Sequence, residues 1–206
     1  MSLSEILSQG FVLIQFLAAL TAIFFWKNYK NTILWIFIPF LVYSFLNELS
    51  VLIINFELGI KTRPFYNVFT MLSFFVYLYF FDRLLKLKSI KYIVILIFAL
   101  AVIYDIIVFD FTKLYKASLF TVSFMILIFS VTYFVKLLKS DEVINYKKIP
   151  EFWIILGLLL FYMAFTPLLA VTGIGYGVTN AYYIAINILN YILYCCYIIG
   201  FYVTGK

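Results

Sequence analysis

Long apolar segments separated by short polar connectors run through the whole chain. Each segment is continuous, without the alternation of apolar and polar positions that a membrane β-barrel strand requires. A helix of about twenty residues crosses the hydrocarbon core of a bilayer. The pattern therefore predicts an all-α membrane protein, a bundle of seven transmembrane helices in a single domain covering residues 1–206. The predicted spans are 6–26, 33–56, 64–81, 92–109, 117–138, 152–172 and 181–203.

Prolines and charges mark the ends of these segments. Pro64 and Pro150 stand at or just before helix starts, where a missing backbone N–H costs nothing. The third segment is short before Asp82 and Arg83, and it can extend to about residue 85 if those charges reach the interface. The first segment does not have the polarity of a cleavable signal peptide, because its basic residues follow the apolar run.

The basic residues are unevenly divided between the two sets of alternate connectors. Four of the fifteen lie on one side, namely Lys61, Arg63, Lys113 and Lys116, and eleven lie on the other. Because positive charge is retained in the cytoplasm, we expect the N-terminus outside and the C-terminus in the cytoplasm. This topology accounts for the net charge of +6, so the lipid bilayer is the expected partner and no nucleic acid is required.

Composition narrows the functional classes. The chain is 67% hydrophobic and 12% charged, with a mean hydropathy of +1.12, and a soluble domain would need more polar surface. Histidine is absent, which removes imidazole-ligated haem, histidine-based zinc hydrolysis and Ser-His or Cys-His nucleophiles. The two cysteines, Cys195 and Cys196, are adjacent and provide too few ligands for a metal site. We therefore expect no cofactor and no enzymatic activity.

Polar residues inside the predicted spans concentrate in the half nearer the outside. Glu48 lies eight residues from the outer end of the second span, or about 12 Å deep. An ionisable residue at that depth usually faces the bundle interior or a water-filled cavity. We therefore predict an outward-facing ligand pocket around Glu48. Its predicted lining is Asn47, Glu48, Asn67, Thr70, Ser73, Asp105, Tyr162, Thr166, Asn187 and Asn190.

Two further features bear on this pocket. Ser, Thr and Asn side chains also hold membrane helices together, so individual members of the set can serve packing instead of ligand binding. Pro167 in the sixth span and Pro39 in the second interrupt the helical hydrogen bonds, and they are the candidate hinges.

Three functions fit these observations. The first is a sensor or receptor subunit that binds a small ligand from outside and acts through a signalling partner. The second is a small-solute transporter built as three helices, a linker helix and three helices, which a weak repeat between residues 67–77 and 187–197 supports. The third is a structural or assembly factor whose polar residues only hold helices together. The apolar inner halves offer little to line an inward path, so the sensor ranks first.

Several segments resemble a known group of proteins. "KNYKNTILWIFIPFLVYSFLNEL", "YNVFTMLSFFVYLYFF", "FWIILGLLLFYMAFTP" and "NILNYILYCCYIIGF" are similar to small bacterial seven-helix proteins often encoded beside sensor histidine kinases. The resemblance covers nearly the whole chain. It implies a signalling association, with a histidine kinase as one possible partner, and it assigns no catalytic or ligand residue.

Overall fold

The protein is entirely helical over the residues described by the computed structural model, which are 3–57, 62–173 and 180–205. Seven long helices are joined by short helical or irregular connectors. In chain order the elements are α1 (Leu3–Phe24), α2 (Trp26–Tyr29), η1 (Ile33–Ile36), α3 (Phe37–Glu57), α4 (Arg63–Leu85), α5 (Ile90–Val108), α6 (Lys116–Leu138), η2 (Asp141–Lys148), α7 (Pro150–Gly173) and α8 (Asn180–Val203).

The predicted apolar segments coincide with the long helices to within about one turn at each end. Six helical segments in the described part of the chain are long and apolar enough to cross a membrane, and the last of these six is α8. The α1 helix contributes a shorter apolar stretch, Gly10–Phe24. The protein is therefore a multi-pass helical membrane protein, and the lipid bilayer is its surrounding medium.

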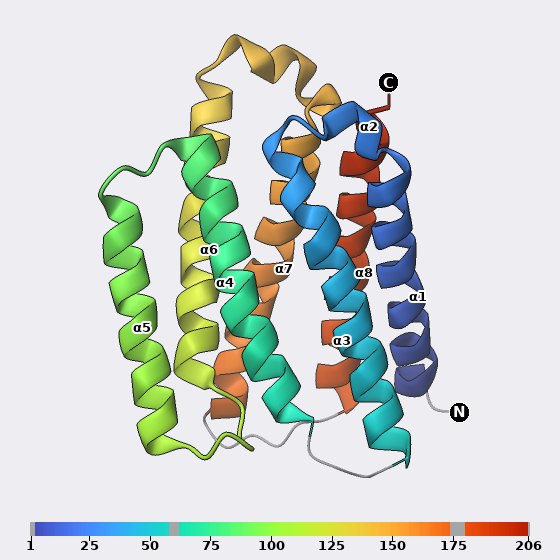
Figure 1. Cartoon of the computed structure of the whole chain (residues 1–206), viewed down its shortest axis with the longest axis vertical. Helices are drawn as coiled ribbons and strands as arrows, with labels where there is room; N and C mark the ends of the chain where they lie inside the picture. Colours follow the sequence, from blue (N-terminus) through green and yellow to red (C-terminus); the bar gives the residue numbers. More distant parts are fainter. Residues whose placement is uncertain (1–2, 58–61, 174–179, 206) are drawn as a thin grey trace.

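Six of the long helices close into a ring. Following the contacts around it, α1 packs on α3, α3 on α4, α4 on α6, α6 on α7, α7 on α8, and α8 again on α1. The helix α5 lies outside this ring against α6, at the left edge of Figure 1. Only Phe98 and Asp105 of α5 are buried, so most of its surface faces lipid.

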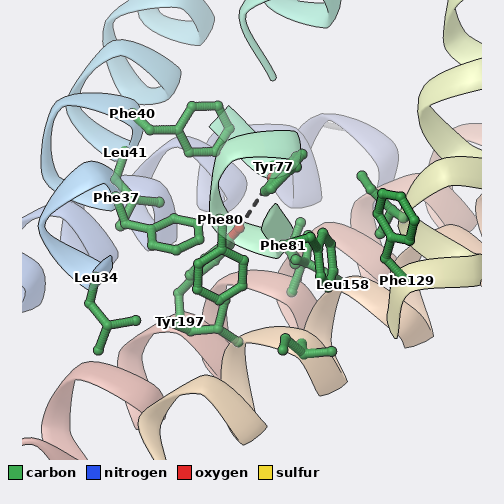
Figure 2. Close-up of a cluster of buried hydrophobic side chains, with 14 of the residues drawn as sticks. Leu34, Phe37, Phe40, Leu41, Tyr77, Phe80, Phe81, Phe129, Leu158 and Tyr197 are labelled. Carbon is green, nitrogen blue, oxygen red and sulfur yellow. Dashed lines mark hydrogen bonds between the residues drawn. The ribbon is translucent and has the colours of Figure 1, made fainter. Parts of the chain in front are cut away.

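Aromatic side chains fill the middle of the ring. Phe37 of α3 packs edge-on against Phe80 of α4, with ring centroids 4.9 Å apart. Figure 2 shows how these rings surround the hydrogen bond between the hydroxyl oxygens of Tyr77 in α4 and Tyr197 in α8, which lie 3.1 Å apart. Close packing of this kind is the main force between helices in lipid, where the hydrophobic effect does not draw them together.

The two ends of the bundle carry different charges. We name them after one exposed residue each: the Asp110 end, where α5 passes to α6, and the Lys86 end, where α4 passes to α5. Three basic residues of the described part lie at the Asp110 end, namely Arg63, Lys113 and Lys116. Ten lie at the Lys86 end, namely Lys27, Lys30, Arg83, Lys86, Lys88, Lys91, Lys136, Lys139, Lys147 and Lys148.

Candidate functional site

The Glu48 carboxylate lies between α3 and α4 in the half of the bundle nearer the Asp110 end. Ser44, Glu48 and Val51 share one face of α3, and the burial of Ser44 and Val51 shows that this face is turned inward. The Tyr66 hydroxyl of α4 donates a hydrogen bond to Glu48 Oε1 at 3.2 Å. Glu48 remains partly accessible, and it forms no ion pair within the described residues. The carboxylate can therefore still accept from, or pair with, a further group.

A hollow of about 440 Å³ opens between α3 and the start of α4, and its lining includes the chain neighbours of Glu48 and Tyr66 but not those two residues themselves. Its wall is largely apolar and is formed by Tyr43, Leu46, Asn47, Ser50, Pro64, Phe65, Val68 and Phe111. Asn47 is 7% exposed, and its side-chain amide has no hydrogen-bond partner in the part of the chain that the structure describes. Asn47 and Glu48 are adjacent in the chain, so the hollow and the carboxylate lie on two sides of the same seam between helices.

Asn67 is fully engaged within the protein. Its side-chain nitrogen donates to the carbonyl oxygens of Phe111 at 3.3 Å and Lys113 at 2.8 Å. Its side-chain oxygen accepts from the Tyr115 backbone N–H at 3.0 Å. The amide thus holds the α5–α6 connector onto the start of α4, and its hydrogen-bonding capacity is largely spent there.

Asp105 is also engaged within the protein. It is completely buried on α5 and accepts from the backbone N–H groups of Ala117 at 3.2 Å and Ser118 at 2.8 Å. The Ser118 hydroxyl donates to it as well, at 2.7 Å. These groups form the first turn of α6, whose own N-cap residue, Tyr115, makes no side-chain cap. Asp105 therefore caps a neighbouring helix, where a negative charge also suits the helix dipole.

The other predicted pocket residues are distributed along three helices. Four hydroxyl or amide groups donate to the carbonyl one turn earlier in their own helix: Thr70, Ser73, Thr166 and Asn190. Tyr162 is buried edge-on against Tyr77, and Asn187 is partly accessible. The structure thus brings Glu48 together with Tyr66 of α4, while Asn67 and Asp105 hold the α5–α6 connector in place.

A buried polar chain that the sequence did not single out joins α1, α8 and α3. Gln15 Nε2 donates to the Tyr194 hydroxyl at 3.0 Å, and that hydroxyl donates to Ser44 Oγ at 3.3 Å. The Gln15 side-chain oxygen is buried without a partner among the described residues. Gln15 is the one amide within the apolar stretch Gly10–Phe24, and that was the signal available in the sequence.

The two candidate hinges occupy different positions. Pro39 lies in the first turn of α3, directly after η1, where few helical hydrogen bonds depend on its missing N–H. Pro167 lies inside α7, with its side chain exposed. A proline there cannot donate to the carbonyl of Met163 one turn earlier, so α7 is the helix with an interior weak point.

No protein family matches the chain, and no curated protein or solved structure shows significant similarity to it. Within the described residues, no three Cys, Asp or Glu side chains lie close enough together to hold a metal ion. The fold defines the class: a multi-pass helical membrane protein. Its partly accessible carboxylate, Glu48, lies between α3 and α4 in the half of the bundle nearer the Asp110 end.

Proposed function

We propose that the chain is a sensor in a bacterial inner membrane, with seven spans and its Asp110 end outside. A small ligand would bind from outside between α3 and α4, and the basic Lys86 end would contact a signalling partner such as a histidine kinase. The excess of basic residues at the Lys86 end supports this orientation. The histidine kinase as partner is inferred from the family resemblance.

One observation carries the ligand site: Glu48 accepts only from Tyr66 among the described residues. The hollow with the unpaired Asn47 amide, across the seam between α3 and α4, supports it. A carboxylate at this depth is costly unless it is protonated or paired with a cation. The apolar wall suits the body of an amphiphilic molecule, and the carboxylate suits a cationic head. We therefore assign an alkylamine or alkylammonium compound as the ligand class.

The path to the partner would run along α4. This helix holds Tyr66 near its first turn, Tyr77 in the middle of the bundle and Arg83 near its last turn. A ligand that breaks the hydrogen bond between Tyr66 and Glu48 would change the packing of α4 on α3, and the packed aromatic core would transmit the change as a discrete shift.

A transporter is the second candidate, and the ring of helices favours it. Two triplets, α1–α3–α4 and α6–α7–α8, complete the ring while α5 stands outside, as a linker helix would. Tyr77 and Tyr197 occupy corresponding positions in the weak sequence repeat, and their hydroxyls meet between α4 and α8. The aromatic core around that contact argues against a polar path through the middle.

The test is thermal unfolding of the purified protein in lipid nanodiscs with a series of alkylamines and quaternary alkylammonium ions. We compare the wild type with Glu48→Gln and with the control Glu142→Gln, which removes an exposed carboxylate at the other end. One class of compound should raise the melting temperature of the wild type and the control and leave that of Glu48→Gln unchanged, because ligand binding stabilises only a protein that binds it.

Other outcomes contradict the proposal in distinguishable ways. A large loss of stability or abundance in Glu48→Gln without ligand assigns the carboxylate to structure, as in an assembly factor. Equal stabilisation of all three proteins places the ligand away from Glu48. If no compound stabilises the wild type, the ligand class is wrong. Uptake of the stabilising compound by proteoliposomes would favour the transporter. If no signalling protein co-purifies with the chain from its native host, the proposed signalling partner is wrong.

A further inference from the structure

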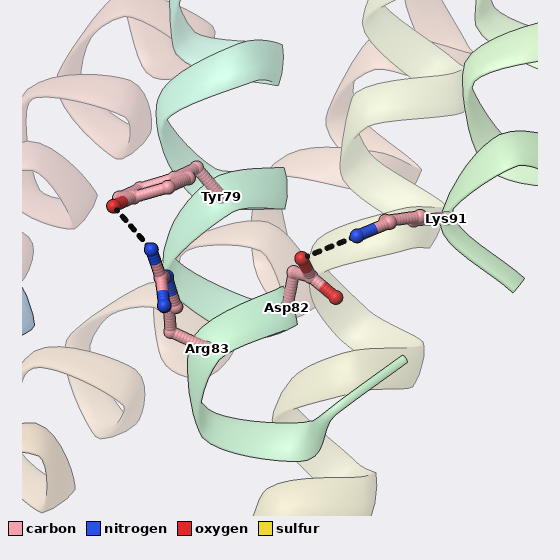
Figure 3. A network of polar contacts seen from close by, with 4 residues as sticks. All are labelled: Tyr79, Asp82, Arg83 and Lys91. Atoms are coloured by element: carbon pink, nitrogen blue, oxygen red, sulfur yellow. Dashed lines mark hydrogen bonds and ion pairs between the residues drawn. The ribbon is translucent and has the colours of Figure 1, made fainter. Parts of the chain in front are cut away.

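A second hollow, of about 600 Å³, lies at the Lys86 end, where α4 ends and α5 begins. Its lining contains no aliphatic side chain and consists of Tyr79, Asp82, Arg83, Lys86 and Lys91. Four of these residues belong to the last two turns of α4 or its cap, and Lys91 belongs to the first turn of α5. Figure 3 shows Tyr79, Asp82, Arg83 and Lys91 in two bonded pairs on the end of α4 and the start of α5.

The charges of the hollow do not cancel. Lys91 Nζ lies 3.0 Å from Asp82 Oδ2, and this is the only salt bridge in the described part of the chain. Arg83 and Lys86 therefore have no carboxylate partner among the described residues. Since Asp82 neutralises one cation of three, the hollow retains a net positive charge, which attracts an anion.

Hydrogen-bond donors of the kind that bind anions border the hollow. Arg83 donates to the Tyr79 hydroxyl at 3.3 Å, and its guanidinium carbon lies 5.3 Å from the centre of the Tyr79 ring. The Tyr79 hydroxyl accepts in this bond, so its own proton is available to a ligand. Three kinds of donor thus border the hollow: a guanidinium, an ammonium and a phenol hydroxyl.

The backbone presents Lys86 in an unusual conformation. Lys86 has φ 56° and ψ 58°, and its N–H caps α4 by donating to the Asp82 carbonyl at 2.8 Å. This left-handed position at the end of a helix usually holds glycine, because a side chain there is strained. The chain thus has a lysine where the backbone alone would favour glycine, and the cap fixes the backbone of Lys86 at the edge of the hollow that it lines.

The surface next to the hollow continues toward the middle of the membrane. Phe75, Tyr79 and Arg83 follow one another at intervals of four residues and so share a face of α4. Phe75 is 57% exposed, and it lies about 12 Å along the helix axis from Arg83. A charged group, an amphipathic ring and an exposed apolar ring in this order match the headgroup, interface and acyl chain of a lipid.

We propose that this hollow binds the phosphate of an anionic phospholipid from the leaflet at the Lys86 end. Arg83, Lys86 and the Tyr79 hydroxyl hold the phosphate oxygens, and an acyl chain lies along Phe75. This site is separate from the proposed ligand site near Glu48, and it requires neither a signalling partner nor an outside ligand. The competing interpretation is that these cations only set topology, in which case they would act like any other basic residues at this end.

The test is native mass spectrometry of the protein released from nanodiscs that contain phosphatidylglycerol and phosphatidylcholine. The double variant Arg83→Gln/Lys86→Gln is compared with Lys147→Gln/Lys148→Gln, which removes the same charge from η2 outside the hollow. We expect one retained phosphatidylglycerol on the wild type and on the control. The affinity of the Arg83/Lys86 variant should be roughly ten- to thirtyfold lower, since two charge-assisted hydrogen bonds to the phosphate are lost, which the control keeps.

A third variant distinguishes the loss of a lipid site from a general loss of the fold. Asp82→Asn removes the carboxylate of the hollow and frees Lys91, so phosphatidylglycerol should bind more tightly than to the wild type, a result that a damaged fold would not give. Equal losses in both double variants, or no preference for phosphatidylglycerol over phosphatidylcholine, would overturn the site. Retention of inorganic phosphate in pure phosphatidylcholine discs, abolished by the Arg83/Lys86 double variant, would assign the hollow to free phosphate and overturn the lipid.

Discussion

Buried polar residues of this protein differ in whether their hydrogen bonds are completed by the chain itself. Asn67 and Asp105 each make several bonds to backbone groups of the α5–α6 connector or α6. Glu48 makes one hydrogen bond, which it accepts from the Tyr66 hydroxyl, and Asn47 makes none in the described residues. The first pair therefore has a structural role, and the second has hydrogen-bonding capacity left for a ligand.

Replacing Asp105 by alanine tests this division. The change leaves two backbone N–H groups and the Ser118 hydroxyl without their acceptor in a fully buried position. We expect a loss of about 2–4 kcal/mol in the free energy of unfolding, from the lost cap and the unpaired donors. Unfolding in mixed micelles with increasing dodecyl sulfate measures it. Asp110→Ala, an exposed acid on the same connector, is the control, and equal stability of the two variants would contradict the capping role.

The position of these carboxylates along their apolar helices could be predicted from the sequence, and their hydrogen-bond partners could not. Glu48 and Asp105 both stood out as carboxylates in apolar helices, and their depths followed from the helical rise. The role of Asp105 depends on donors twelve and thirteen residues later, across a connector whose path no local pattern determines. The absence of a capping residue before Lys116 was the one available signal.

The helix α5 has few side-chain attachments to the ring formed by the other six long helices. Phe98 stacks on Phe74 of α4 with ring centroids 3.8 Å apart, midway between the Asp105 cap and the ion pair of Lys91. Val94 and Val102 also pack on the core, and most of the remaining surface of α5 faces lipid, so few side chains attach this helix to the ring.

Phe98→Ala removes the middle attachment. Because the transfer from water contributes little between helices in lipid, we expect a loss of about 1–2 kcal/mol instead of the larger cost of a soluble core. With one cysteine introduced in α4 and one at facing positions of α5, disulfide crosslinking should depend less on which α5 position carries the cysteine in this variant. Leu100→Ala, on the exposed side of α5, should leave both stability and crosslinking unchanged. Similar losses from the two variants would show that α5 is not held through Phe98.

Helix boundaries were predictable because hydrophobic length alone determines them in a membrane. The placement of α5 was not predictable, since its residues are apolar on every side and give no preferred face. In α8 the polar positions 183, 187, 190 and 194 follow one stripe, and one of them, Tyr194, is the residue that reaches α1 and α3.

For the molecule as a whole, the division of charge between the two ends predicts its orientation. In a variant without native cysteines, Asp110→Cys should react with a membrane-impermeant maleimide in intact cells, because the Asp110 end is expected outside. Ser89→Cys, exposed at the Lys86 end, should react only after the membrane is permeabilised. The reverse labelling pattern would invert the topology and place both proposed sites on the wrong sides.

The closure of the ring by its first and last helices has a consequence for biogenesis. During synthesis α1 emerges from the ribosome long before α8 is made. Yet α8 is the main neighbour of α1, and its Tyr194 is the partner of the Gln15 amide. During synthesis this amide must wait in lipid, or be shielded by an insertion factor, until the final span arrives. A nascent chain stopped before α8 therefore presents an unpaired polar group to the bilayer, a mark by which cellular quality control could distinguish an unfinished protein from a finished one.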